Sequence, residues 1–398
     1  MVVYPRAPGN DQGELTLRSV PYATQWIDEA DIDAVAAALR SPWLTQGPKV
    51  KDFEEKVAAY CGAKYAVAMN SGTSALHAAC FAAGISAGDE VITSPITFVA
   101  SANCVLYCGG KPVFADVEWE TANISAEKIT AAINSKTKAI IPVHFSGNPV
   151  ELKEISKIAK AKGLTVIEDA AHALGAEYEG KKIGSCAYSD LTCLSFHAVK
   201  HITTGEGGMV LTNNKAFYTK LMMFRTHGIT REQSVLTRPD EGAWYYELHH
   251  LGFNYRLTDF QAALGIKQLE KLDKFIKRRQ EIVIQYERAL AGLAGVKTIK
   301  VKPGRASAWH IYPVVVSDKR KEIFEQLRSK GIGVNVHYFP VYLQPYYRQL
   351  GYQPGLCPNA EAYYHGAITL PLFPKMNDED VTYVIDTFKQ VISEAGLP

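Results

Sequence analysis

Apolar runs rich in β-branched residues alternate with helical patterns between residues 63 and 213. Seven runs predict strands, at 65–69, 90–93, 112–116, 139–145, 165–168, 191–196 and 209–212. The spacing of apolar residues predicts helices at 73–83, 99–108, 126–132, 150–161 and 215–226. This alternation indicates βαβ units, and therefore an α/β fold with a large, mostly parallel seven-stranded sheet. Sheets of this kind bind ligands at the carboxyl ends of their strands.

The pattern changes after about residue 254. One long amphipathic helix is predicted at 258–293, followed by "HIYPVVV", a helix at 321–330, "GVNVHYFP" and a last helix at 378–395. We therefore expect two domains. The large one covers 1–257 and includes an N-terminal arm, and the smaller α+β domain covers 258–398 and includes the long helix.

Composition narrows the range of functions. The 398 residues are 47% hydrophobic and 21% charged, and the net charge of +2 provides no basic surface for nucleic acid. The sequence shows no span of about 18 apolar residues for a membrane. Its start lacks the apolar segment of a signal peptide, so we expect a cytoplasmic protein. The seven cysteines lack zinc-site spacing and are interpreted as reduced packing residues.

The first candidate for chemistry is Lys200, in "CLSFHAVKHITTGEGGMVL". It follows a predicted strand and precedes glycines 205, 207 and 208, which allow backbone conformations that other residues resist. Two interpretations compete. Lys200 is either a solvated lysine at a strand end or a Schiff-base lysine with an activated amine.

Three other strand ends carry unusual residues. In "VAMNSGTSALHAA", Asn70 to Ser74 open a helix, which is either an anion seat or a plain N-cap. In "TVIEDAAHALG", Asp169 is either a helix cap or an acid with a cationic partner, and the partner is either a metal ion or a protonated ring nitrogen. No further hard-oxygen or imidazole ligands at suitable spacing favour a metal. In "ITSPITFVASANC", Phe98 is either a core residue or a stacking face for an aromatic ring.

Together, an amine, an acid, an anion seat and a stacking face suit a planar phosphorylated aldehyde with a basic ring nitrogen. Pyridoxal 5'-phosphate (PLP) has these features, and an aspartate on its ring nitrogen is its usual protein setting. Asp169 and Lys200 are far enough apart for one strand–helix–strand passage or its loop equivalent.

Six motifs, in order, resemble the PLP-dependent nucleotide-sugar aminotransferases of the DegT/DnrJ/EryC1/StrS family. They are "NSGTSALHAA", "SPITFVASANCVLYCGGKPVFADV", "VIEDAAHALGAEY", "SFHAVKHITTGEGGMV", "RTHGI" and "LGFNYRLTDFQAALG". The resemblance covers nearly the whole chain from about residue 21. Within the family, "SPWLTQGP", "WYYELHHLGFNYR" and "GIGVNVHYFPVYLQPYY" are most similar to the branch that serves pseudaminic acid synthesis.

The resemblance implies the PLP-dependent transferase fold type I and a homodimer with shared active sites. It implies that Lys200 is the Schiff-base lysine and Asp169 the partner of the ring nitrogen. The implied cofactor contacts are Gly72, Thr73, Phe98, His172, Ser195 and, from the other subunit, Asn254; the implied substrate contacts are Tyr22, Pro42, Trp43, Leu44, Thr45, His337, Tyr338, Phe339 and Pro340. Gly72 stands where alanine is common in this branch. His197 and His201 flank the lysine and are interpreted as structural.

The activity that the resemblance implies is transfer of the amine of L-glutamate to a UDP-linked 2-acetamido-2,6-dideoxyhexos-4-ulose, with 2-oxoglutarate as co-product. Another dTDP- or GDP-linked keto sugar is the alternative substrate. Two alternatives belong to other classes: a PLP-binding regulator without turnover, and a lysine-dependent aldolase. The regulator is disfavoured because no basic helix-turn-helix segment is present.

Overall fold

A seven-stranded sheet forms the centre of the computed structural model, which describes residues 18–397. Its strands are β1 (Tyr65–Met69), β2 (Glu90–Thr93), β3 (Lys111–Phe114), β4 (Thr137–Ile141), β5 (Thr165–Asp169), β8 (Leu191–Ser195) and β9 (Gly208–Thr212). Their order is β1-β9-β8-β5-β4-β2-β3, and only β9 runs antiparallel to its neighbours. The predicted mostly parallel sheet of seven strands is confirmed.

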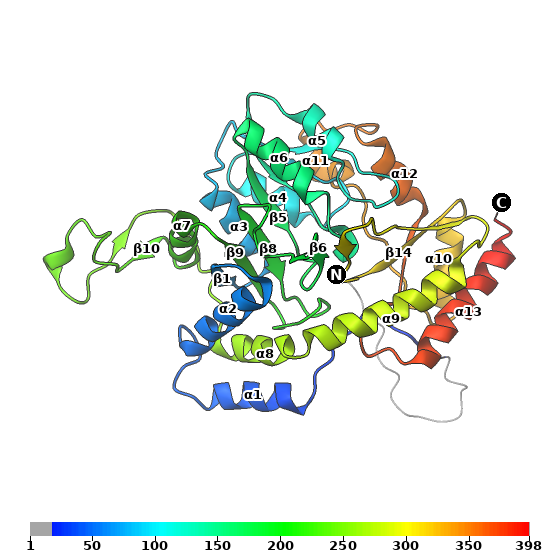
Figure 1. Ribbon diagram of the computed structural model, residues 1–398, viewed down its shortest axis with the longest axis horizontal. Helices are drawn as coiled ribbons and strands as arrows, with labels where there is room; N and C mark the ends of the chain where they lie inside the picture. The colour runs from blue at the N-terminus through cyan, green and yellow to red at the C-terminus, as the bar shows by residue number, and fades with distance from the viewer. Residues whose placement is uncertain (1–17, 398) are drawn as a thin grey trace.

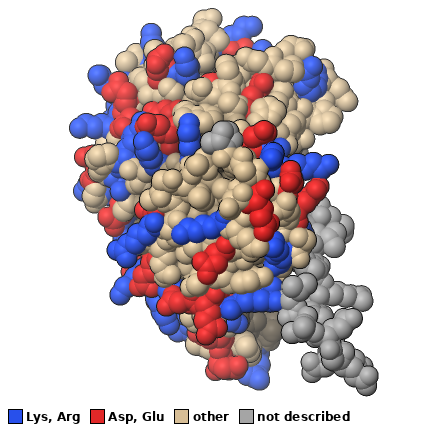
Figure 2. All heavy atoms as spheres, turned by 90° about the vertical axis from the view of Figure 1, so that its right-hand side faces the viewer, with Lys and Arg blue, Asp and Glu red and all other residues tan. Residues whose placement is uncertain are grey.

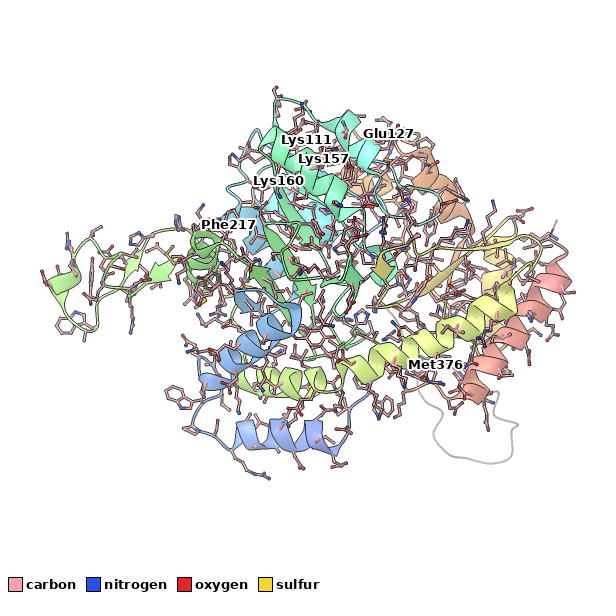
Figure 3. All side chains as sticks on the ribbon, in the orientation of Figure 1. Lys111, Glu127, Lys157, Lys160, Phe217 and Met376 are labelled. Carbon is pink, nitrogen blue, oxygen red and sulfur yellow. The ribbon has the colours of Figure 1, made fainter. Side chains whose placement is uncertain are left out.

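Helices cover both faces of this sheet (Figure 1). They are α2 (Pro48–Cys61), α3 (Gly72–Ala82), α4 (Ala100–Tyr107), α5 (Ala126–Ala132), α6 (Leu152–Lys162), α7 (Lys215–Arg225) and α8 (Asp259–Leu269). The alternation of side chains along each strand assigns the faces, because Val67 packs with α3, α4 and α7 whereas Ala68 packs with α2, α6 and α8. On α6, Leu152, Ile155 and Ala159 are buried, and Lys157 and Lys160 lie on the outer face (Figure 3).

The predicted single helix at 258–293 is wrong, because the structure has two helices there. The first, α8, ends at Leu269, and the second, α9, runs over Leu272–Leu290. At the break, the Lys271 N–H donates to Gln268 O, three residues back, at 3.1 Å. The Lys271 ammonium contacts Asp28 at 2.8 Å and Asp31 at 2.5 Å, beside the start of α1 (Glu29–Leu39). Tertiary ion pairs therefore accompany a break between two helices that the apolar period does not reveal.

The C-terminal part builds a second, antiparallel sheet of β12 (Val296–Thr298), β14 (Tyr312–Val316) and β15 (Ala367–Leu370). Helices α9, α10 (Arg320–Ser329), α11 (Pro345–Gln349), α12 (Pro358–Gly366) and α13 (Asp378–Ala395) surround it. Beside α9, the carbonyl of Met376 accepts hydrogen bonds from Arg278 at 2.8 and 3.2 Å (Figure 3). The segment "GVNVHYFP" forms no strand and makes a single bridge, Asn335 to Thr369. The domain boundary at 257/258 stays a prediction, and residues 1–17 of the expected arm lie outside the described part.

Smaller elements complete the chain. They are β6 (Glu177–Tyr178), β7 (Lys181–Lys182) and β13 (Arg305–Ala306) in one small sheet, and β10 (Ile229–Thr230) paired with β11 (Glu247–Leu248). The β10–β11 arm projects from the body, and it carries Trp244, which is 77% exposed (Figure 1). On the face shown in Figure 2, acidic and basic side chains are interspersed. All seven cysteines are free, and within residues 18–397 no helix is long and apolar enough to cross a membrane.

Candidate active site

Lys200 lies in the loop between β8 and β9, as the sequence predicts. The loop turns back on itself through hydrogen bonds from the N–H of Lys200 to His197 O and from the N–H of Thr204 to Phe196 O. Of the three glycines expected to permit unusual backbone, only Gly205 has a positive φ, of 77°. Gly208 is needed for close approach instead, because a Cβ there would lie 2.2 Å from Ser71 O. The glycines therefore bring the lysine loop against the start of α3.

The amine of Lys200 is not that of a solvated surface lysine. It is partly buried, and its Nζ lies 3.4 Å from Nε2 of His310. Burial lowers the pKa of Lys200 from 10.5 to about 8, although the nearby Asp169 carboxylate opposes this change. A substantial fraction of the amine is therefore neutral near physiological pH, as a nucleophilic or proton-carrying lysine requires.

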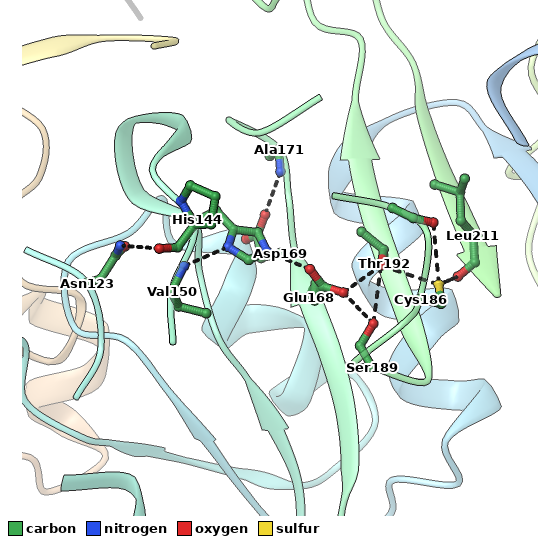
Figure 4. Close-up of polar contacts among 12 residues, drawn as sticks. Asn123, His144, Val150, Glu168, Asp169, Ala171, Cys186, Ser189, Thr192 and Leu211 are labelled. Atoms are coloured by element: carbon green, nitrogen blue, oxygen red, sulfur yellow. Dashed lines mark hydrogen bonds and ion pairs between the residues drawn. The ribbon is translucent and has the colours of Figure 1, made fainter. Parts of the chain in front are cut away.

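Glu168 and Asp169 end β5 and point to opposite faces of the sheet (Figure 4). Glu168 accepts hydrogen bonds from His144 Nε2 at 2.7 Å, from Thr192 at 3.1 Å and from Ser189. The His144 proton is on Nε2, since Nδ1 accepts from the N–H of Val150. Glu168 is therefore a structural acid, fully satisfied by the protein.

Asp169 is 5% exposed, and no Lys or Arg in the described chain forms an ion pair with it. Its Oδ1 accepts from the N–H of Ala171 at 3.1 Å, and its Oδ2 accepts from the Ser101 hydroxyl at 2.5 Å. The alternative of a helix cap is wrong, because turns rather than a helix follow β5. Two donors and no cation leave a buried carboxylate that suits a cationic ligand atom.

The hydroxyl beside Asp169 is itself held in place. Ser101 lies on α4, and its Oγ is 2.6 Å from Oγ1 of Thr97. Because the Ser101 proton is directed to Asp169, the Thr97 hydroxyl donates to Ser101. Both side chains are buried, so the chain from Thr97 through Ser101 fixes the orientation of the carboxylate.

The start of α3 has the features of an anion seat. Ser71 and Ser74 form a capping box, which satisfies the N–H of Ser74. In the described chain, the N–H groups of Gly72 and Thr73 donate to no acceptor. A Cβ at Gly72 would lie 2.9 Å from the Cβ of Ser195, so glycine lets the end of β8 approach the helix. Two open amides at a helix N-terminus favour a phosphate.

Phe98 is 57% exposed just before α4, so the interpretation as a core phenylalanine is wrong. An exposed aromatic ring beside the Thr97–Ser101 pair offers a stacking face. The position of Phe98 in the chain predicts a helix start, but only the fold shows that its ring is left uncovered.

Aromatic and imidazole side chains from the N-terminal segment, the turn after β5 and the C-terminal part lie near Lys200. His172 Nε2 is 3.2 Å from the Tyr338 hydroxyl, and the two rings are stacked at 24°. His337 bonds Thr369 through Nδ1 at 2.8 Å and lies 3.5 Å from the Tyr22 hydroxyl. Burial lowers the pKa of His337 to about 3 and that of His172 well below its usual value. These imidazoles are neutral and serve as hydrogen-bonding groups.

The remaining predicted site residues lie farther out. Pro42, Trp43, Leu44 and Thr45 are exposed, and Leu44 O accepts from the N–H of Asp259 at 3.0 Å. No hydrogen bond or ring contact in residues 18–397 joins this loop to Lys200. Phe339 packs on Tyr364, and Pro340 is buried. Asn254 is exposed, and its carbonyl accepts from Asn70.

Sequence reasoning missed His310, which contacts the Lys200 amine directly. The residue begins the segment "HIYPVVV", whose apolar part forms β14. A polar residue at the very start of a buried run was the available signal. Of the two flanking histidines, His197 is exposed and lies 3.9 Å from Glu206, while His201 is buried and bonds Ala308 O at 3.1 Å. Both contacts agree with a structural role.

The donor set fits PLP. An amine, a carboxylate, two open helix amides and an exposed ring are grouped, and Nδ1 of buried His172 has no partner in the described chain. In residues 18–397 no group of three His, Cys, Asp or Glu side chains is arranged to hold a metal ion. The site therefore suits an organic cofactor with a basic ring nitrogen and a phosphate.

Known proteins resemble the chain over most of its length. UDP-4-amino-4,6-dideoxy-N-acetyl-beta-L-altrosamine transaminase of Campylobacter jejuni subsp. jejuni serotype O:23/36 is 41% identical over 94% of this chain and 98% of its own. Spore coat polysaccharide biosynthesis protein SpsC of Bacillus subtilis is also 41% identical, over the same shares.

The solved structure of Helicobacter pylori PseC, an aminotransferase of pseudoaminic acid biosynthesis, is 33% identical. It superposes with a TM-score of 0.88 over 95% of this chain and 100% of its own, which confirms the expected fold type I. The family model for the DegT/DnrJ/EryC1/StrS aminotransferases matches residues 25–389. The chain therefore belongs to the DegT/DnrJ/EryC1/StrS aminotransferase family and is a PLP-dependent sugar aminotransferase.

Proposed function

We propose that Lys200 binds the cofactor through its amine and carries the proton during amine transfer. The observation that supports this most is the partly neutral amine of Lys200 near the buried carboxylate of Asp169, which forms no ion pair in the described chain. In this proposal Asp169 pairs with the protonated ring nitrogen, and the Gly72 and Thr73 amides and the Ser195 hydroxyl hold the phosphate. Phe98 covers the ring, and His172 lies beside its phenolic oxygen.

PLP, when bound, withdraws electrons from the substrate carbon and carries the amine between donor and acceptor. The chain supplies the rest. Asp169, fixed by Ser101, keeps a negative charge at the ring nitrogen, and Lys200 moves the proton, so no second base is needed. The family assignment leaves no support for the two other classes raised by the sequence, a regulator without turnover and an aldolase.

We propose a UDP-linked 2-acetamido-2,6-dideoxyhexos-4-ulose as the amine acceptor and L-glutamate as the donor, with 2-oxoglutarate as co-product. The names of the Campylobacter jejuni and Helicobacter pylori relatives support this substrate and a role in pseudaminic acid synthesis. The exposed loop from Pro42 to Thr45, together with Tyr22 and the segment from His337 to Pro340, would contact the sugar nucleotide.

A different nucleotide sugar is the second candidate, because SpsC matches the chain at the same 41% identity and its name specifies another glycan. The test is amination of a panel of UDP-, dTDP- and GDP-linked 4-keto and 3-keto sugars, with products identified by NMR. Preference for the UDP 4-keto sugar supports the proposal, and a larger kcat/KM for a dTDP or GDP sugar overturns it. Lys200→Ala should abolish turnover with every substrate.

We propose a cytoplasmic homodimer in which Asn254 reaches the phosphate in its partner's site. The exposure of Asn254 and its place at the foot of the projecting β10–β11 arm support this assignment. Subunits with Lys200→Ala are mixed with subunits with Asn254→Ala under conditions that allow exchange. If Asn254 acts in trans, hybrid dimers contain one intact site, and activity rises above that of either variant. No recovery after proven exchange, with an impaired Asn254→Ala enzyme, places Asn254 in its own subunit's site or in no site.

A further inference from the structure

The amine of Lys200 has one hydrogen-bonding contact in the described chain, and that contact is an imidazole. Nε2 of His310 lies 3.4 Å from Nζ of Lys200. His310 is 3% exposed, so the imidazole side of this contact is shielded from water. The two residues are 110 positions apart in sequence, which means that the fold has to bring them together.

The backbone of His310 is fixed from two sides. Its N–H donates to Ser146 O at 2.9 Å, and its carbonyl accepts from the buried Arg279 guanidinium at 3.0 Å. The neighbouring Gly147 makes this possible, since a Cβ there would lie 2.5 Å from His172 O and 2.9 Å from Trp309 N. The imidazole is therefore mounted on a rigid support against the lysine.

The ring of His310 has no structural hydrogen bond of its own. It lies between His172 and His201, at centroid distances of 4.4 and 5.5 Å. His201 bonds a backbone carbonyl and His337 bonds Thr369, but Nδ1 of His310 has no partner in the described chain. Buried polar side chains are normally paired, so a purely structural role does not explain this histidine.

The charge states favour a hydrogen bond in which Lys200 is the donor and His310 the acceptor. Burial and the nearby cation of Lys200 lower the pKa of His310 well below its usual value, so the ring is neutral while the Lys200 pKa is about 8. The other titratable or charged groups near the pair are Asp169, His172, His201, Arg279 and His337.

We propose that His310 is the positioning residue of Lys200: its neutral imidazole accepts a hydrogen bond from the lysine ammonium and holds the amine in the crevice whenever it is not joined to the cofactor. This inference rests on the proposed role of Lys200. It predicts that His310 influences how the free amine titrates, and not only how well the protein folds.

The test measures how fast the full-length chain, freed of cofactor, recombines with PLP between pH 6 and 10, followed by absorbance. The midpoint of this profile reports the Lys200 amine and should be about 8 in the wild type. In His310→Leu the ammonium loses its acceptor, so the midpoint should fall by about one pH unit. His310→Gln, whose amide oxygen reaches the position of His310 Nε2, should restore most of the wild-type midpoint. His197→Leu is the matched control, and its midpoint should not move.

An unchanged midpoint in a folded His310→Leu protein, checked by circular dichroism, overturns the proposal. If the leucine variant does not fold, His310→Asn makes the same test, because its amide is too short to reach the amine. Lys200→Ala separates the two levels of the argument. If Lys200→Ala still forms a borohydride-trapped adduct with PLP at the same site, the role of Lys200 itself is wrong. If it does not, an unchanged midpoint refutes His310 alone.

Discussion

Burial of the Lys200 amine should destabilise the cofactor-free protein at neutral pH, and removal of the amine should restore that stability. The pKa of Lys200 falls from 10.5 to about 8, chiefly because burial disfavours the ammonium. One pKa unit corresponds to about 1.36 kcal/mol, so the loss is about 3 kcal/mol at most. Lys200→Met removes the charge and keeps a flexible apolar side chain of similar length.

The pH window follows from the two pKa values. Between pH 8 and 10.5 the unfolded chain binds a proton that the folded chain does not, so stability rises with pH in this range. Below pH 8 both states are protonated and the full loss is present. Above pH 10.5 both are neutral and the loss vanishes. The free energy of unfolding of Lys200→Met should therefore exceed that of the wild type by about 3 kcal/mol at pH 7 and by close to zero near pH 10.5.

Urea unfolding of both cofactor-free proteins at pH 7 and pH 10.5 measures this difference, in which the other titrating groups cancel. Lys157→Met, at an exposed position on α6, is the matched control and should show no such pH dependence. The reasoning is refuted if Lys200→Met is no more stable than the wild type at pH 7, or if the difference is the same at both pH values.

Three further changes test other parts of the site. Asp169→Asn should keep the fold, since Ser101 and the backbone can still bond an amide, and should lower kcat by about 10- to 100-fold; an unchanged kcat would make Asp169 structural. Phe98→Ala should change the free energy of unfolding by less than about 0.5 kcal/mol, because the ring is exposed. It should weaken PLP binding, measured by equilibrium dialysis, roughly 10-fold, and an unaltered affinity would exclude stacking of Phe98 on the PLP ring. Asp259→Ala removes the acceptor of the Gly47 and Lys49 amides, at 2.8 and 3.0 Å, next to the Pro42–Thr45 loop. It should raise KM for the sugar nucleotide more than it lowers kcat. An unchanged KM would show that the Pro42–Thr45 loop does not bind the sugar.

The sequence by itself determined the strands, most of the helices and the chemical types grouped at the site. Each strand of the large sheet is a local apolar run, and local patterns specify such elements without help from the rest of the chain. Ser71 marks the start of α3 because it caps that helix through its own side chain. Asp169 was identifiable because a charged residue at the end of a buried strand requires an explanation, and Lys200 because it lies between a predicted strand and a glycine-rich segment.

Tertiary structure decided the features that depend on contacts between distant segments. The division between α8 and α9 coincides with ion pairs from Lys271 to the start of α1, which no apolar period encodes. Glu168 differs from its neighbour Asp169 because the opposite face of the sheet supplies His144 as its partner. His310 reaches Lys200 only after the C-terminal part packs against the sheet. The physical reason is common to all three: pairing and burial arise between residues far apart in sequence, and local spacing carries no information about them.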